Sequence, residues 1–245
     1  YFLADMAGDR ASKQSALDIA EQAVAKAPQL AEAYAARGTP RLSFFRDWDG
    51  ARADFEQALQ LNPASTRAQI GYYRLLMALG RHAEAVAAAR AATTTDPLAL
   101  EAWTSFGRAL YAQGEHAAAH QALARALEIA PDSIYAGFAY GVNELLQGRA
   151  QQALEAFRKS DSVYRPAGIA MAEHSLGHAR ESQQALDEAI TTEGTSGAYQ
   201  IAQVYAWRGE TDKAFEWLDV ALVHNDGGLT FLKSDPVIGK LAHDP

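Results

Sequence analysis

Cysteine is absent from all 245 positions of the sequence. A chain without thiol groups forms no disulfide, offers no thiolate to a metal ion and has no cysteine nucleophile. The cytoplasm and an oxidising periplasm both suit such a chain, and the absence of cysteine points slightly to the second. The compartment therefore stays open between the cytoplasm and the periplasmic side of a bacterial inner membrane.

Long apolar runs and phosphate-binding loops are missing as well. No stretch approaches about 18 consecutive apolar residues, the length typical of a spanning helix, so we expect no membrane insertion by this region. The patterns G-x-G-x-x-G and G-x-x-x-x-G-K-[ST], which cradle phosphates, do not occur. The formal net charge of −8 disfavours binding to the phosphates of nucleic acid or anionic lipid. We therefore expect no nucleic acid partner for this region.

A fixed period is the strongest feature that the sequence does contain. Five prolines follow one another at intervals of 34 or 35 residues. They are Pro28, Pro63, Pro97, Pro131 and Pro166. Such a period indicates a solenoid, in which each repeat packs on its neighbours and no single globular core forms.

Residues 100–131 show the repeat most fully. They read W-x2-F-G-x2-L starting at Trp103, then Gly114, then A-x3-L-x2-A starting at Ala119. Apolar residues at three- and four-residue spacing predict two helices, and the glycine between them suits the left-handed residue that ends a helix. Glycines follow the corresponding helices of other repeats at Gly80, Gly148, Gly177 and Gly209.

This pattern resembles the tetratricopeptide repeat (TPR) family. The resemblance implies an all-α fold, a right-handed α-solenoid of about seven helical hairpins over residues 1–226, the first of them truncated. We expect residues 1–6 to be the tail of a helix and the chain to be a fragment of a longer protein. One departure concerns Tyr72 and Tyr73, where the family usually has a small residue. This bulk should push the helices apart locally or turn a ring into the groove.

The period ends before residue 227. We predict that residues 227–245 form a C-terminal cap packed on the last repeat within a single domain, because a solenoid end exposes an apolar face. The residues expected to cover that face are Phe231, Leu232, Val237, Ile238 and Leu241. The run G-L-x-x-L-K-x-D-P from Gly228 also resembles the end of TPR regions in bacterial signalling proteins, namely winged-helix regulators, class III adenylate cyclases and Ser/Thr kinases. That resemblance implies a regulatory region, with an effector domain upstream that could be catalytic.

Two histidine pairs are candidate metal ligands. His116 with His120, and His174 with His178, have the four-residue spacing that lets two imidazoles share a metal ion. No third ligand and no H-E-x-x-H order accompany them, so packing roles are favoured and we expect no metal and no cofactor. Carboxylate pairs fall in turns or on solvated faces, so the sequence does not support an enzyme.

The first helix of each repeat carries a second stripe of residues beside its packing stripe. In the TPR family this stripe faces the concave groove, so by position we expect a partner-binding surface there. Its members are Arg67, Arg74, Met77, Thr104, Arg108, Tyr111, Tyr135, Phe138, Tyr199, Gln203 and Trp207. Arginine and aromatic residues are enriched at binding hot spots, although the same residues could be packed aromatics and solubilising charges.

Two functional readings follow. In the first, the chain is a non-catalytic module that binds a protein or peptide segment in its groove and serves as the sensor or regulatory region of a bacterial signalling protein. In the alternative, it is a free-standing scaffold or assembly factor for a cell-envelope complex. Both rest on resemblance to a fold that serves many partners, so the sequence does not identify the partner.

Overall fold

The computed structural model describes residues 10–160 and 163–243, and every regular element in these ranges is helical. The expected helix tail at residues 1–6 lies outside them. The α-helices are α2 (Arg10–Lys26), α3 (Ala31–Ser43), α4 (Trp48–Leu61), α5 (Thr66–Ala78), α6 (His82–Thr95), α7 (Leu100–Ala112), α8 (His116–Ile129), α9 (Ile134–Leu146), α10 (Ala150–Lys159), α11 (Arg165–Ser175), α12 (Ala179–Thr192), α13 (Ala198–Arg208) and α14 (Thr211–Val223). The 3₁₀ segments are η1 (Gly194–Gly197), η2 (Gly227–Ser234) and η3 (Ile238–His243).

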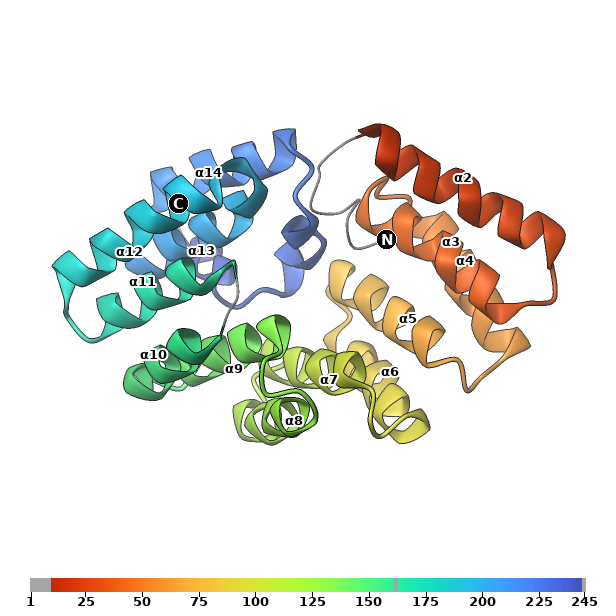
Figure 1. Cartoon of the computed structure of the whole chain (residues 1–245), viewed down its shortest axis with the longest axis horizontal. Coiled ribbons are helices and arrows are strands. Elements are labelled where there is room, and N and C mark those ends of the chain that lie inside the picture. The colour runs from red at the N-terminus through yellow and green to blue at the C-terminus, as the bar shows by residue number, and fades with distance from the viewer. Residues whose placement is uncertain (1–9, 161–162, 244–245) are drawn as a thin grey trace.

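Consecutive helices pack in pairs, from α3 with α4 to α13 with α14, and each pair packs on the next. The helix α2 packs on α3 as the second helix of an incomplete first hairpin. Figure 1 shows the hairpins following a strongly curved path, so that the first and last of them approach each other. The predicted all-α solenoid of helical hairpins is confirmed.

Glycines end the first helices as the sequence predicts. Gly80 and Gly114 have left-handed backbones, with φ of 73° and 88°, which side chains with a Cβ atom rarely adopt. The next residue turns back onto the helix: the amide of Arg81 donates to the carbonyl of Leu76 over 2.9 Å. This is the hydrogen bond of a glycine-terminated helix end, and it sets the tight turn of each hairpin.

Close packing between repeats depends on single phenylalanine rings facing glycine. The ring of Phe157 is fully buried, and a Cβ atom added at Gly141 or Gly168 would come within 2.4 Å of it. Gly141 lies on the partner helix within the hairpin and Gly168 on the first helix of the next repeat. One ring therefore joins three helices, which approach closely because both glycines lack a side chain.

The tail (residues 227–243) crosses the inside of the curved solenoid. Val237, Ile238 and Leu241 are buried in the cluster that contains α13, the first helix of the last repeat. Phe231 instead joins a cluster with residues of α5 and α7, several repeats away. In Figure 1 the dark blue tail lies in the middle of the molecule, between α13 and α5. The tail thus reaches across the concave side as well as contacting the last repeat.

Two details differ from the expected apolar cover. Leu232 is 40% exposed, whereas its neighbour Phe231 is buried, so Leu232 covers less apolar surface than expected. Phe215, Leu222 and Val223 on α14 remain 50%, 53% and 80% exposed. The tail follows the groove and leaves these α14 side chains open to solvent.

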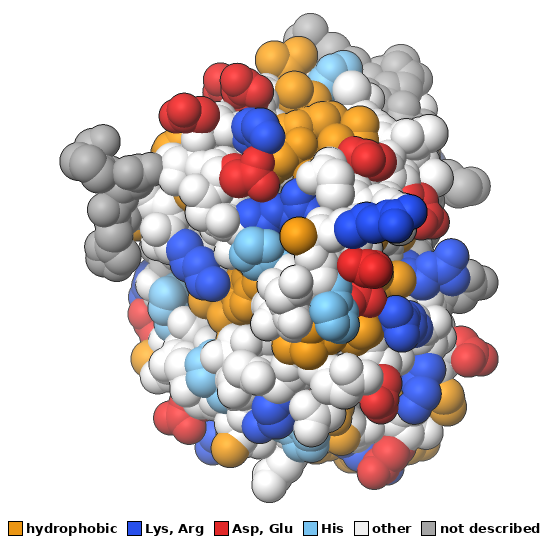
Figure 2. Space-filling model, turned by 90° about the vertical axis from the view of Figure 1, so that its left-hand side faces the viewer, with side chains coloured by type: hydrophobic (Ala, Val, Ile, Leu, Met, Phe, Trp, Pro, Cys, Tyr) orange, Lys and Arg blue, Asp and Glu red, His pale blue; other side chains and the backbone are white. Residues whose placement is uncertain are grey.

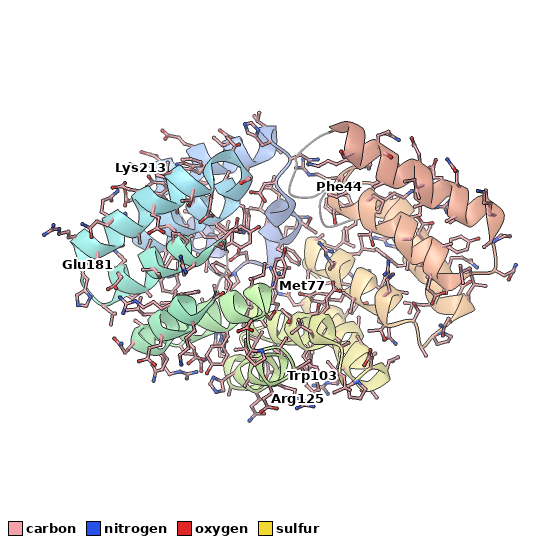
Figure 3. The ribbon with its side chains drawn as sticks, in the orientation of Figure 1. Phe44, Met77, Trp103, Arg125, Glu181 and Lys213 are labelled. Carbon is pink, nitrogen blue, oxygen red and sulfur yellow. The ribbon has the colours of Figure 1, made fainter. Side chains whose placement is uncertain are left out.

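Hydrogen bonds join the N-terminal and C-terminal hairpins at a point just before the tail. The side-chain nitrogen Nδ2 of Asn225 donates to the main-chain carbonyl of Phe44 over 2.9 Å, and Arg46 donates to the side-chain oxygen of Asn225 over 3.1 Å. Asn225 and Arg46 both have positive φ, 53° and 51°, an uncommon backbone for residues other than glycine. These bonds join the loop after α3 to the end of α14, and Figure 3 labels Phe44 of this loop.

Candidate binding groove

The concave face is lined by the first helices of the hairpins. In Figure 3, Met77 of α5 lies on this inner side near the tail, whereas Arg125 and Glu181 lie on the outer side. The tail occupies the part of the face between α5, α7 and α13. This part of the face is therefore a groove that already holds a peptide segment.

Asp235 fixes the tail on α13. One of its carboxylate oxygens accepts the hydroxyl of Tyr199 over 2.8 Å and the side-chain amide of Gln203 over 2.6 Å. The other accepts the amide of Val237 over 2.8 Å and begins the last turn of the tail. Burial, and then the charge of Asp235, raise the pKa of Tyr199 well above its usual value, so the hydroxyl keeps its proton and donates to the carboxylate.

Phe231 fixes the tail on α7 and α5. Its ring centroid lies 4.1 Å from the guanidinium carbon of Arg108, a cation–π contact, and its edge joins a buried cluster with Tyr73. Burial raises the pKa of Tyr73, and the nearby charges of Arg108 and Arg74 partly offset that rise. Arg108 and the buried phenol of Tyr73 thus lie at the place where the ring is bound.

Ser234 and Lys240 make the remaining polar contacts of the tail with the groove. The hydroxyl of Ser234 donates to the main-chain carbonyl of Met77 over 2.5 Å and lies 2.9 Å from Nε2 of His82. The ammonium of Lys240 lies 3.4 Å from the ring centroid of Trp207, and burial lowers the pKa of this lysine. The tail therefore contacts the groove through an aromatic ring, a hydroxyl, a carboxylate and a cation.

The structure divides the predicted groove residues into three sets. Those at or beside the tail are Met77, Arg108, Tyr111, Tyr199, Gln203 and Trp207. Thr104 and Phe138 serve packing, because the Thr104 hydroxyl donates to the carbonyl of Leu100 and the Phe138 ring lies 5.5 Å from that of Phe157. Arg67 and Tyr135 are exposed and Arg74 is half-buried. Partner binding by these residues stays a prediction.

Sequence reasoning assigned no binding role to Tyr73 and to the polar residues of the tail. Tyr73 had one signal: it stands where the repeat usually has a small residue, and its ring now lies in the cluster that receives Phe231. Asp235 belongs to the run from Gly228 that resembles the tails of signalling proteins, and its contacts with Tyr199 and Gln203 span more than 30 residues of sequence. Spacing within a repeat carries no information on contacts of that range.

The histidine pairs take part in hydrogen bonds between helices. His120 Nδ1 lies 2.8 Å from Glu144 Oε1, and His178 Nδ1 lies 2.7 Å from Glu173 Oε2. Nδ1 of His116 lies 3.2 Å from the side-chain oxygen of Asn143. Across residues 10–160 and 163–243, no three side chains of histidine, aspartate or glutamate are placed to share a metal ion.

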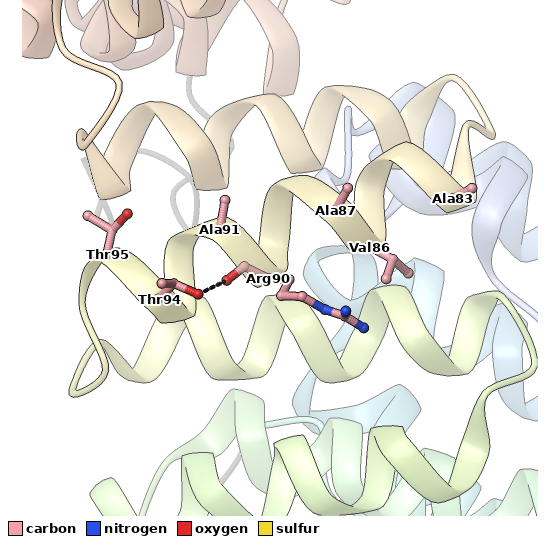
Figure 4. A pocket seen from close by; sticks show the side chains of 7 residues that line it. All are labelled: Ala83, Val86, Ala87, Arg90, Ala91, Thr94 and Thr95. Carbon is pink, nitrogen blue, oxygen red and sulfur yellow. Dashed lines mark hydrogen bonds between the residues drawn. The ribbon is translucent and has the colours of Figure 1, made fainter.

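A shallow hollow lies on the surface along α6, away from the tail. Its lining consists of Ala83, Val86, Ala87, Arg90, Ala91, Thr94 and Thr95 (Figure 4). Mostly small alanine side chains form it, and its one charged side chain, Arg90, reaches over the ring of Phe106 at 5.4 Å. A stripe of small residues with one such cation offers little chemistry, so we assign it no binding role.

The outer surface on the side of α10 to α12 shows mixed character. Basic, acidic and hydrophobic side chains are interspersed over the face drawn in Figure 2. Such mixing is typical of a solvated surface. None of the helices that the structure describes is both long enough and apolar enough to cross a membrane.

Several solved structures share this architecture. The Cut9–Hcn1 hetero-tetramer of the APC/C matches with a TM-score of 0.69 and 19% identity, over 91% of this chain and 44% of that chain. PilW, described as a widely conserved type IV pilus biogenesis factor, matches with a TM-score of 0.66 and 22% identity, over 79% of this chain and 90% of that one. YrrB, a TPR protein with an unusual peptide-binding site, matches with a TM-score of 0.52 and 16% identity, over 82% and 97%. These identities support the fold alone, and this chain spans less than half of the Cut9–Hcn1 chain.

The sequence itself has no match among curated proteins. The sequence profile of the tetratricopeptide repeat matches three overlapping segments, residues 42–99, 73–134 and 104–168. Together these segments span just over half of the 245 residues and contain the hairpins α5–α6, α7–α8 and α9–α10 in full. The chain therefore belongs to the tetratricopeptide repeat family.

Proposed function

We propose that this chain is a non-catalytic module that binds a protein or peptide segment on its concave face. The TPR fold suggests such binding, and the neighbour YrrB is described as having a peptide-binding site. The observation that carries the proposal is the tail itself. It is a peptide segment bound in the groove through specific side chains, among them Arg108, Tyr199 and Gln203.

Part of the predicted stripe remains accessible to solvent. Arg67 is exposed, Tyr135 is 43% exposed and Arg74 is half-buried. Two cations and a phenol suit a segment that carries carboxylates and apolar side chains. Because the chain as a whole carries a net charge of −8, this local basic character is not a by-product of overall charge.

We further propose that the module is the regulatory region of a bacterial signalling protein. The run from Gly228 to Pro236 supports this setting through its resemblance to the tails of such proteins. A free-standing scaffold for a cell-envelope complex is the alternative, which the match over 90% of the PilW chain favours. The sequence of the complete gene separates the two, since an effector domain upstream of residue 1 supports the first.

Photo-crosslinking tests the binding site. A benzoylphenylalanine introduced at Tyr135 in cells of the source organism is expected to capture a partner, whereas the same probe at Ala87, exposed on α6, is not. Reversing both charges with Arg67→Glu and Arg74→Glu should reduce the adduct at position 135 about tenfold or more, since truncated hot spots typically cost about 2 kcal/mol. Arg125→Glu on the outer side is the matched control, and circular dichroism checks helicity.

Arg108 is left unchanged in that test because Phe231 packs on it, so its replacement would also disturb the tail. Adducts at Ala87 alone would place recognition on the outer face. An adduct at position 135 that survives both charge reversals would show that the two arginines take no part.

A further inference from the structure

The tail presents a short pattern of side chains to the groove. Phe231 lies in the cluster formed by residues of α5 and α7. The hydroxyl of Ser234 donates a hydrogen bond to the main-chain carbonyl of Met77. The carboxylate of Asp235 accepts hydrogen bonds from Tyr199 and Gln203 of α13. The three contacting residues of the tail are thus spaced three positions apart, from 231 to 234, and then one position apart, from 234 to 235. Each is made to a different part of the groove, so together they fix both the direction and the register of a bound segment.

The three contacts are chemically selective. The Arg108 guanidinium above the ring of Phe231 favours an aromatic side chain over an aliphatic one. Two donors, from Tyr199 and Gln203, converge on one oxygen of Asp235, which favours a carboxylate over an amide or a hydroxyl. The Met77 carbonyl selects a donor, which the hydroxyl of Ser234 provides.

The tail satisfies this site incompletely. The hydroxyl of Tyr73 and the side-chain oxygen of Gln203 are buried and find no hydrogen-bond partner among the described residues. Leaving a buried polar group unpaired costs free energy. The two turns of the tail are 3₁₀ helices, whose hydrogen-bond geometry is poorer than that of an α-helix. A segment that forms hydrogen bonds with these two buried groups would therefore bind the groove more tightly than the tail does, apart from the advantage that the tail gains from being tethered.

We propose that this part of the groove recognises a partner segment with an aromatic residue, a hydroxyl residue three positions later and a carboxylate four positions later. Residues 227–243 hold the same place in cis until such a segment displaces them. The inference rests on the proposed function of the concave face and names its partner class. The tail is tethered through Asn225, so its effective concentration is on the order of millimolar, and a free segment must overcome that advantage.

A synthetic peptide of residues 227–243 with a fluorescent label is the probe, and fluorescence anisotropy measures its binding to the full chain. In the chain carrying Phe231→Ala and Asp235→Ala the tail is loosened, and the peptide should bind about tenfold or more tightly than to the native chain. The matched control carries Leu232→Ala and Lys233→Ala, changes at exposed tail positions, and should behave as the native chain does. A peptide with both the aromatic and the carboxylate removed should lose binding by a similar factor.

Several outcomes would overturn the inference. One is no binding of the peptide to a loosened chain that keeps native helicity, and another is equal binding to the native and loosened chains. Dimers of the native chain in sizing experiments, broken by the loosening changes, would mean that the tail occupies the groove of a second copy. Crosslinking at Tyr135 without peptide binding would leave the proposed function standing and remove only this partner class.

If the loosened chain loses helicity, hydrogen exchange on the native chain tests whether the peptide displaces the tail. Amides of residues 229–241 should exchange faster when the peptide is added in about millimolar excess, because the peptide takes the place of the tail. The amides of α8, far from the tail, serve as the internal control. Unchanged exchange of residues 229–241 under saturating peptide would overturn the inference.

Discussion

Replacing Phe157 with alanine is expected to lower the free energy of unfolding by about 3–5 kcal/mol, the usual loss for a buried phenylalanine. The ring is fully buried between Gly141 and Gly168, and neither glycine has a side chain that could fill the space. The contact joins two hairpins, so its loss weakens both a repeat and the interface with its neighbour. In a solenoid these nearest-neighbour contacts supply the stability.

Denaturant unfolding followed by circular dichroism measures this loss, and Phe215→Ala is the control. Phe215 lies on α14 with half of its surface exposed, so its removal should cost about 1 kcal/mol or less. For a chain of this size the buried change corresponds to a fall in melting temperature of about 6–20 °C. If Phe157→Ala destabilised the chain as little as Phe215→Ala does, the ring of Phe157 would not stabilise the contact between the repeats.

Replacing Glu193 with glutamine is expected to stabilise the fold at neutral pH by about 3 kcal/mol and to have little effect near pH 4.5. Glu193 is buried at the end of α12, and neither carboxylate oxygen has a hydrogen-bond partner among the described residues. Burial, then the charges of Asp226 and Glu188, raise its pKa to about 8. The folded chain therefore keeps the proton up to about pH 8, whereas the unfolded chain releases it near pH 4.5.

The sign of the effect follows from this difference in bound protons. As the pH rises from about 4.5 to 8, the unfolded state is stabilised by ionisation and the folded state is not, so the native chain loses stability over that range. Glutamine does not ionise, so the variant does not lose stability as the pH rises through this range. Unfolding curves at several pH values test this, with Glu181→Gln, at an exposed position of α12, as the control. A gain at neutral pH that is equally large at pH 4.5 would contradict a raised pKa.

The sequence predicts the helical hairpins well because their signals are local. Glycines such as Gly80 and Gly114, which have left-handed backbones, each mark the end of one helix. The prolines recur with a period of about 34 residues, which is the length of one hairpin. These signals also fix the register of each repeat, and the register determines which residues of the first helices face the concave side. The pattern could therefore select Arg108, Tyr199 and Gln203 as inner residues without any knowledge of the tail.

The path of the tail could not be read in this way. Phe231 and Tyr73 lie in one cluster although they are far apart in the sequence, and no periodicity relates them. Leu232, which was expected to cover an apolar face, is 40% exposed, whereas its neighbour Phe231 is buried. Tyr73 was the one local sign of the contact, since a large ring at a small-residue site required some change in packing.

Forming a disulfide between the tail and the α5–α6 turn tests the central claim, that the tail lies in the groove of its own chain. A Cβ atom added at Gly80 would lie 3.9 Å from the Cβ of Lys233, within the range of about 3.5–4.5 Å found in disulfides. The native chain has no cysteine, so Gly80→Cys with Lys233→Cys supplies the only two thiols. Gly80 has a left-handed backbone, and a cysteine there costs about 1–2 kcal/mol, which the fold should tolerate in this turn.

On mild oxidation this variant should form an intramolecular disulfide, remain monomeric and migrate faster on a non-reducing gel, with reduction restoring native migration. The same experiment with Leu232→Cys in place of Lys233→Cys is the control, because only one atom of the tail, the Cβ of Lys233, lies within 4 Å of a Cβ atom added at Gly80. Two thiols that stay reduced, or that link separate chains into dimers, would contradict a tail bound in cis in its own groove.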